Sequence, residues 1–285
     1  MTEETSMHSF HTPTPVRLRV ELWEGSVSLV ADETATTTVE LTPQAGEGAA
    51  QDLVDRATVE QRGDEIVVLM PKSKGGLFRR GYGVRAVIHL PIDSDVHLET
   101  GSADVDARGS LGDCHVSTGS GDVTLELTTD LQARLGSGDL RLEASRGSID
   151  VKGGSSDLVI GDVAGSATIL TGSGDVTLEH VGGRLKIKSG SGDVMLTHAG
   201  EGVDAMAGSG DLLLKRVDQG RVRAKTGSGD IAIGVAQGTA AYLDILTVSG
   251  DVRSTLDSAG APSDGEATVE IDIKSGSGDV VLQRA

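Results

Sequence analysis

The most regular feature of this sequence is an alternation of apolar and polar residues that recurs about every 18 residues. In the last two thirds of the chain, apolar residues stand two positions apart on either side of a Gly-Ser-Gly-Asp turn. A spacing of two residues is the period of a β-strand, whereas a helix repeats every 3.6 residues. Each repeat therefore predicts two short strands joined by a glycine-rich corner.

The turns mark ten copies of the repeat. Their aspartates are Asp104, Asp122, Asp139, Asp157, Asp175, Asp193, Asp211, Asp230, Asp251 and Asp279. Four positions of the repeat are apolar in every copy except at Ser254. Two of them lie one and three residues after the Asp, and the other two lie three and five residues before the turn. Each position forms a column when the copies are aligned. One coil cannot bury such a face, but stacked coils can. We therefore predict an all-β fold, a parallel β-helix (β-solenoid) of about 18 residues per coil.

The N-terminal third is less regular. Residues 1–15 carry no strand pattern and are expected to be a flexible N-terminus. Residues 16–91 alternate like strands in two stretches and hold one short helical pattern near 49–57, which predicts irregular first coils and a cap. Residues 92–285 are predicted to be the regular solenoid, interrupted by a Gly/Ser/Pro/Asp loop at 257–266.

Composition narrows the class of protein. The chain has 40 glycines and few aromatic residues, and its net charge of −18 disfavours nucleic acid and anionic membranes as partners. A single cysteine, Cys114, excludes an intrachain disulfide, so no oxidising compartment is implied. The first residues lack the apolar core of a secretory signal, and no apolar run is long enough for a transmembrane helix. We expect a cytoplasmic protein.

The repeated Gly-Ser-Gly-Asp-Val segments, after a strand-rich N-terminal third, resemble a known family. They are similar to the bacterial "putative adhesin" domains of unknown function, which are related to the toastrack domains of envelope-stress signalling proteins. The resemblance covers roughly residues 16–282. It implies a right-handed parallel β-helix, no established catalytic activity and no catalytic residues.

The aspartates form the most visible candidate site, because stacked coils would place them in one column. Calcium is one interpretation, since it takes carboxylate and carbonyl oxygens, as in calcium-binding β-rolls. The structural interpretation is that each Asp accepts backbone N–H bonds of its own turn. The second corner of the repeat lacks the second Asp of the calcium rolls, which favours the structural interpretation.

Histidine and serine columns are weaker candidates. His97 and His115 share one column, and His180 and His198 share another. Neighbouring imidazoles suit Zn²⁺, but no further ligand stands at a clear spacing, so surface histidines are the favoured interpretation. A serine occupies every turn, whereas a nucleophile needs one distinctive serine beside a base. We expect no metal, no cofactor and no catalytic residue.

Two surfaces remain as candidates for binding a partner. The first is an outward column over five successive coils, made of Val159, Thr177, Met195, Leu213 and Ala232. Such a stripe suits a docking face, although single surface aliphatics are common and other segments could cover it. The second is the loop 71–83, which gathers Lys72, Lys74, Phe78, Arg79, Arg80 and Tyr82. It suits an acidic partner or a phosphate, or it is a solvated loop whose aromatic residues pack against the solenoid.

These observations predict a non-enzymatic scaffold or protein-interaction module of adhesin-like type. Self-association through the solenoid ends is also expected, because residues 279–282 of the last coil would form an unpaired strand edge. Three alternatives remain: a regulatory module in envelope-stress signalling, a calcium-binding β-roll, and a β-helix that binds or cleaves carbohydrate. The last would need aromatic platforms and paired carboxylates in a groove, and most of the few aromatic residues lie outside the repeats.

Overall fold

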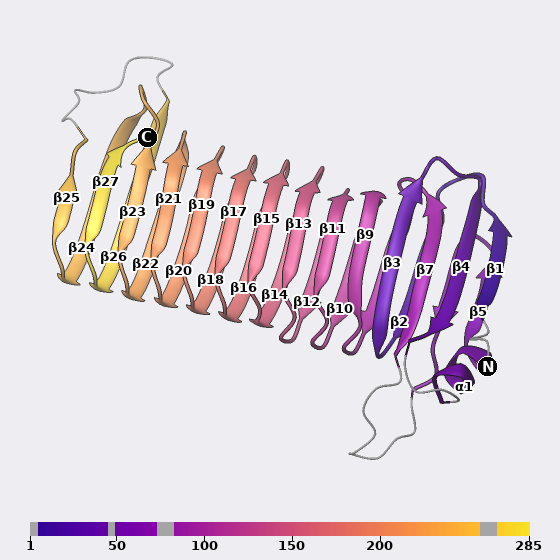
Figure 1. Cartoon of the computed structure of the whole chain (residues 1–285). Coiled ribbons are helices and arrows are strands. Elements are labelled where there is room, and N and C mark those ends of the chain that lie inside the picture. Colours follow the sequence, from indigo (N-terminus) through magenta and orange to yellow (C-terminus); the bar gives the residue numbers. More distant parts are fainter. Residues whose placement is uncertain (1–4, 45–48, 73–82, 257–266) are drawn as a thin grey trace. The chain divides into compact units, whose positions relative to one another are not determined.

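The computed structural model describes residues 5–44, 49–72, 83–256 and 267–285. The chain forms two compact units, Met1–Ala144 and Ser145–Ala285. Each unit consists of two layers of strands. From β7 (Val84–Pro91) onward, successive strands along the chain alternate between the layers (Figure 1). Neighbouring strands of the repeats are parallel and pair residue for residue, so each coil lies on the one before it.

The second unit is the more regular one. One sheet holds, in spatial order, β14 (Ile149–Ser155), β16 (Ala167–Ser173), β18 (Leu185–Ser191), β20 (Val203–Ser209), β22 (Gly220–Ser228), β26 (Thr268–Ser277) and β24 (Ala240–Ser249). The other sheet holds β15 (Leu158–Val163), β17 (Val176–Val181), β19 (Val194–Ala199), β21 (Leu212–Val217), β23 (Ile231–Val235), β27 (Val280–Arg284) and β25 (Val252–Ser254). A coil is one strand of each sheet, joined by the Gly-Ser-Gly-Asp turn.

The first unit continues the repeat but is modified towards its N-terminus. Its regular strands are β8 (Asp95–Thr100), β10 (Cys114–Thr118) and β12 (Leu131–Leu135) in one sheet, and β9 (Asp104–Ser110), β11 (Val123–Thr128) and β13 (Leu140–Ser145) in the other. Parallel strands β2 (Arg17–Leu22) and β6 (Glu65–Leu69) extend the first sheet, and β3 (Gly25–Asp32) and β7 (Val84–Pro91) extend the second.

Antiparallel strands finish both sheets of the first unit. β5 (Thr58–Arg62) pairs with β6, while β4 (Thr36–Pro43) pairs with β7 and with β1 (Ser6–His11). The one helix in the described part of the chain, α1 (Ala49–Asp55), packs against β4 and β7 with Ala50 and Val54 buried. Residues 6–11 form β1, so ordered structure begins within the segment 1–15, which the sequence predicts to be flexible. The weak, mostly polar alternation of this stretch hides a strand whose hydrogen bonds come from β4.

The predicted apolar columns form the core. All of their positions are buried except Leu243, Ile245, Val252 and Ser254, which belong to β24 and β25. The all-β parallel solenoid is therefore confirmed, while the hand of its winding stays a prediction.

The order of the last coils differs from their order in the sequence. β26 lies between β22 and β24, and β27 lies between β23 and β25 (Figure 1). The expectation that residues 279–282 form an unpaired edge is therefore wrong, because β27 has a partner on each side. The intervals before Asp251 and Asp279 are longer than the usual 18 residues. The extra residues allow β24 and β25 to leave one position free in each sheet, which β26 and β27 then occupy.

Candidate interaction surfaces

The turn aspartates form a hydrogen-bonded ladder between coils. The backbone N–H of each Asp donates to Oδ1 of the Asp in the neighbouring coil, with donor–acceptor distances of 2.7 to 2.9 Å in the second unit. The spatial order of this ladder is Asp157, Asp175, Asp193, Asp211, Asp230, Asp279 and Asp251. The expectation that each carboxylate accepts N–H bonds of its own turn is wrong, because the donor is the backbone N–H of the Asp in the next coil. The spacing between neighbouring strands places that N–H within hydrogen-bonding distance.

The ladder predicts different effects for two substitutions of one aspartate. Asp193→Ala should lower the free energy of unfolding by about 1–2 kcal/mol, because the N–H of Asp211 loses its acceptor. Asp193→Asn keeps an acceptor oxygen and removes one charge from an acidic column, so its effect should stay within about 0.5 kcal/mol. Denaturant unfolding of the two variants measures this difference. Equal losses in both would contradict the structural role of the ladder.

Metal-binding clusters are absent from the part of the chain that the structure describes: no three His, Cys, Asp or Glu side chains there are placed to hold an ion. Cys114 is buried in the core, and burial raises the pKa of its thiol to about 12. A protonated, enclosed thiol is a poor metal ligand and a poor nucleophile.

The histidine pair of the second unit has carboxylate neighbours that the periodicity did not single out. The rings of His180 and His198 stack with centroids 4.8 Å apart. His198 Nε2 lies 2.6 Å from an oxygen of Asp218, and His180 Nδ1 lies 3.6 Å from an oxygen of Asp162. Burial raises the pKa of Asp218, but hydrogen bonds with His198 and Arg216 outweigh it and keep that pKa below its usual value. Each imidazole is thus paired with its own carboxylate.

The predicted apolar column is present in register on the second unit. Val159, Thr177, Met195, Leu213 and Ala232 are direct partners on successive strands from β15 to β23. The inserted strand β27 adds Val281 beside Ala232, which sequence order could not show. Val159 is exposed, and the others are half-buried because they pack against one another. We call these six residues the apolar stripe.

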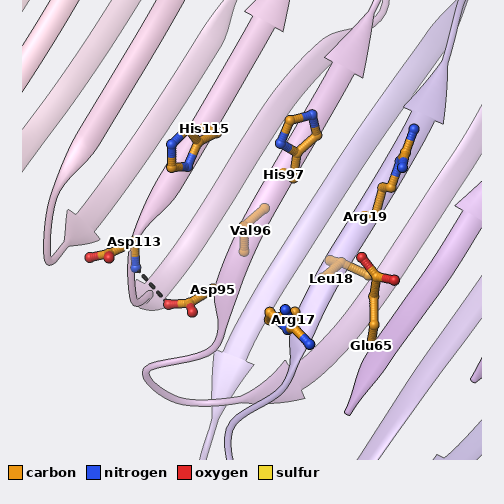
Figure 2. A pocket seen from close by; sticks show the side chains of 9 residues that line it. All are labelled: Arg17, Leu18, Arg19, Glu65, Asp95, Val96, His97, Asp113 and His115. Carbon is orange, nitrogen blue, oxygen red and sulfur yellow. Dashed lines mark hydrogen bonds between the residues drawn. The ribbon is translucent and has the colours of Figure 1, made fainter. Parts of the chain in front are cut away.

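A shallow hollow of about 330 Å³ lies on the first unit, over β2, β6, β8 and β10 (Figure 2). Arg17 and Arg19 reach over it from β2, and His97 and His115 come from β8 and β10 (Figure 2). The two histidines occupy one register position, as predicted, with ring centroids 6.1 Å apart.

Both arginines of this hollow are paired with carboxylates. Arg17 bonds Asp64 at 2.7 Å, and Arg19 bonds Glu21 at 2.6 Å. An oxygen of Asp95 accepts the backbone N–H of Asp113, 2.9 Å away, which is the dashed line in Figure 2. Because each arginine has an acidic partner, neither is left as an unpaired cation for an anion.

The basic loop lies mostly outside the described residues. Lys72 is described, and its Nζ lies 4.0 Å from the ring centroid of Trp23, a cation–π contact. Lys74, Phe78, Arg79, Arg80 and Tyr82 fall within the range 73–82 that the structure does not describe. The binding role of this loop stays a prediction. The helix that the structure describes is too short to cross a membrane.

Stacked parallel coils, buried aliphatic columns and a turn ladder define a β-solenoid repeat protein. The Toastrack DUF4097 family model matches residues 36–283, and the chain belongs to this family. No match is found among curated proteins.

Several solved structures are similar along nearly the whole chain. They include a "putative adhesin" from Parabacteroides merdae (9% identity, TM-score 0.42, 98% of this chain and 96% of that chain). Another "putative adhesin", from Parabacteroides distasonis, has 10% identity and a TM-score of 0.40, with 98% and 97% covered. A "putative lipid binding protein" from the same species has 12% identity and a TM-score of 0.35, with 99% and 96% covered.

Proposed function

We propose that this protein is a non-enzymatic scaffold that binds a protein partner along the apolar stripe of its second unit. The observation that carries the proposal is the register of the stripe: its six positions, from Val159 to Val281, are aligned on six adjacent strands. Outward positions of a strand that faces water are usually polar, so a row that is apolar except at Thr177 suits a contact.

The surroundings of the stripe indicate the chemistry of the partner. The aspartate ladder runs alongside it, two residues earlier on each strand, as at Asp175 beside Thr177. One oxygen of each carboxylate accepts the ladder bond, except at Asp251, which ends the row. The ladder aspartates are exposed except for Asp279, which is half-buried. A partner that matches both features offers a row of apolar side chains flanked by lysines or arginines.

Three further parts of the proposal concern catalysis, location in the cell and self-association. Serine repeats in every turn, and the solvent-facing histidine–aspartate pairs lie beside no distinctive nucleophile, which supports a binding role over catalysis. We also propose a cytoplasmic location, which suits a chain whose single cysteine, Cys114, forms no intrachain disulfide. We also propose self-association through an edge of the second unit.

Leu213→Asp should weaken partner binding at least about tenfold, because it places a charge in the middle of an apolar contact. Affinity purification from the native cell, followed by titration of the recovered partner, measures the effect. Thr197→Asp is the matched control, since it adds the same charge at an exposed position of β19 next to the stripe. Both variants should keep the wild-type melting temperature.

Binding along the stripe should also weaken as salt is added, because the ladder carboxylates attract the partner's basic side chains. Equal binding by wild type and Leu213→Asp would remove the stripe as the docking face. Recovery of a membrane sensor or a transcription regulator as the partner would favour the envelope-stress alternative.

A further inference from the structure

Among the residues that the structure describes, the core of the second unit is uncovered at one edge. Leu243 and Ile245 of β24 continue the buried columns of the other coils, yet Leu243 is 41% exposed and Ile245 is half-buried. Val252 of β25 continues a third core column and is 47% exposed. Within the described part of the chain, these residues have aliphatic neighbours on one side only, in β26 and β27. We call the outer side of these two strands the β24–β25 edge.

The outward face of β24 is also apolar, unlike that of its neighbour. Tyr242 and Leu246 are 55% and 59% exposed, and they stand beside Glu270 and Lys274 of β26. Val248, which replaces the first glycine of the turn, is 83% exposed. Asp244 is the one charged residue in this ten-residue strand. β24 therefore has neither the lysine nor the proline that commonly protects an edge strand from pairing.

We propose that the β24–β25 edge pairs with the same edge of a second copy of this chain. A two-fold axis passing through both sheets would place β24 antiparallel to its copy and β25 antiparallel to its copy at the same time. The edge amides and carbonyls would be paired, and Leu243, Ile245 and Val252 would meet their equivalents in a continuous core. This inference rests on the self-association part of the proposed function and is independent of the apolar stripe.

Two observations favour a second copy as the occupant. The partner must supply one strand to each of two sheets at their spacing, with aliphatic residues between them, and the identical edge meets these requirements. The edge is also the place where two chains of net charge −18 can approach with little local repulsion, since its charged side chains are Asp244, Asp251 and Arg253. Arg253 already pairs with Asp251 at 3.2 Å.

A closed dimer is favoured over a filament because the edge strands of the first unit differ. β5 and β1 run antiparallel to their neighbours, and exposed β5 residues include Arg62, which pairs with Glu60. An edge that fits only itself closes after two copies, whereas a contact between unlike edges adds further copies until it closes a ring or forms a filament.

Sedimentation equilibrium of the full chain over a range of concentrations tests the proposal. Wild type should be a dimer whose affinity rises with added salt, because salt screens the repulsion between two acidic chains while the contact itself is apolar. Leu243→Lys should weaken the dimer at least about tenfold, since the lysine reaches water in the monomer but is enclosed in the dimer. Leu246→Lys gives β24 the residue type that its neighbour β26 has at Lys274, and this variant should also weaken the dimer.

Leu170→Lys is the matched control. Leu170 and Leu246 share one outward column, but Leu170 lies on β16, which has a strand on each side, so this variant should dimerise like wild type. Leu213→Asp should leave the dimer intact and Leu243→Lys should leave stripe binding intact, which separates failure of this inference from failure of the docking face.

Three results would overturn the proposal. They are a wild-type monomer at every concentration and salt level, open-ended oligomers, and a dimer unchanged by both lysine variants. Hydrogen exchange of β24 then names the occupant in the first case. Protected amides in a monomer mean that another segment of the same chain covers the edge, and unprotected amides mean that nothing does.

Discussion

Gly192→Ala is expected to lower the free energy of unfolding by about 3 kcal/mol or more, the largest loss we predict for a single added methyl group. Gly192 has φ +119°, a conformation that L side chains rarely adopt. A Cβ there would lie 2.2 Å from the carbonyl oxygen of Gly174 in the preceding coil. That oxygen is backbone, so the two coils would have to separate locally and weaken the strand pairing between them.

Gly238→Ala separates the two causes. Gly238 also has a positive φ, +76°, but no atom lies within 4 Å of the position that its Cβ would occupy. Its loss should be limited to the conformational term, about 1–2 kcal/mol. Denaturant unfolding curves of wild type and both variants give the comparison. If the two losses are equal, the close approach of the coils at the turn is not what requires glycine at Gly192.

Leu178→Ala should cost about 2–5 kcal/mol, because it opens a cavity that the stacked coils cannot close. Leu178 is fully buried, with Ile160 and Leu196 as its register partners on the two adjacent strands. Since each of these neighbours is held by its own strand pairing, none can move far into the space. The loss should lie near the upper part of this range.

Glu179→Ala is the control for this substitution. Glu179 follows Leu178 on the same strand but is exposed, so its replacement should change stability by less than about 0.5 kcal/mol. Chemical unfolding measures the free energies, and hydrogen exchange shows whether the damage spreads from β17 to the adjacent coils, as expected when stability depends on nearest-neighbour contacts. A small effect at Leu178 would mean that the column is not a close-packed core.

The two proposed contacts have opposite electrostatics. The apolar stripe runs beside the carboxylate ladder, so binding there is attractive for a basic partner and weakens with salt. The β24–β25 edge joins two chains that each carry a net charge of −18 through an apolar surface, so its pairing strengthens with salt. Salt dependence alone therefore tells which contact an experiment observes.

Local features of the chain determined most of the repeat. Alternation sets which side of a strand faces the core, and glycine allows the turn geometry that returns the chain. Both effects act over a few residues, so they can be predicted from a single copy and checked by nine others. The columns through Leu178 and Ile187, and the outward row through Leu213, follow from this periodicity and from the constant interval between turns.

Tertiary structure decided which coil lies beside which. Two coils of the same shape can exchange places at little cost to local geometry. The position of β26 between β22 and β24 is therefore decided by long-range strand pairing and by how well each coil covers the next, and the same holds for β27. The same contacts decided that Asp193 accepts its bond from Asp211, and that His198 meets Asp218. Ser254, the one polar residue in the predicted core columns, already marked the coil that folding leaves at the edge.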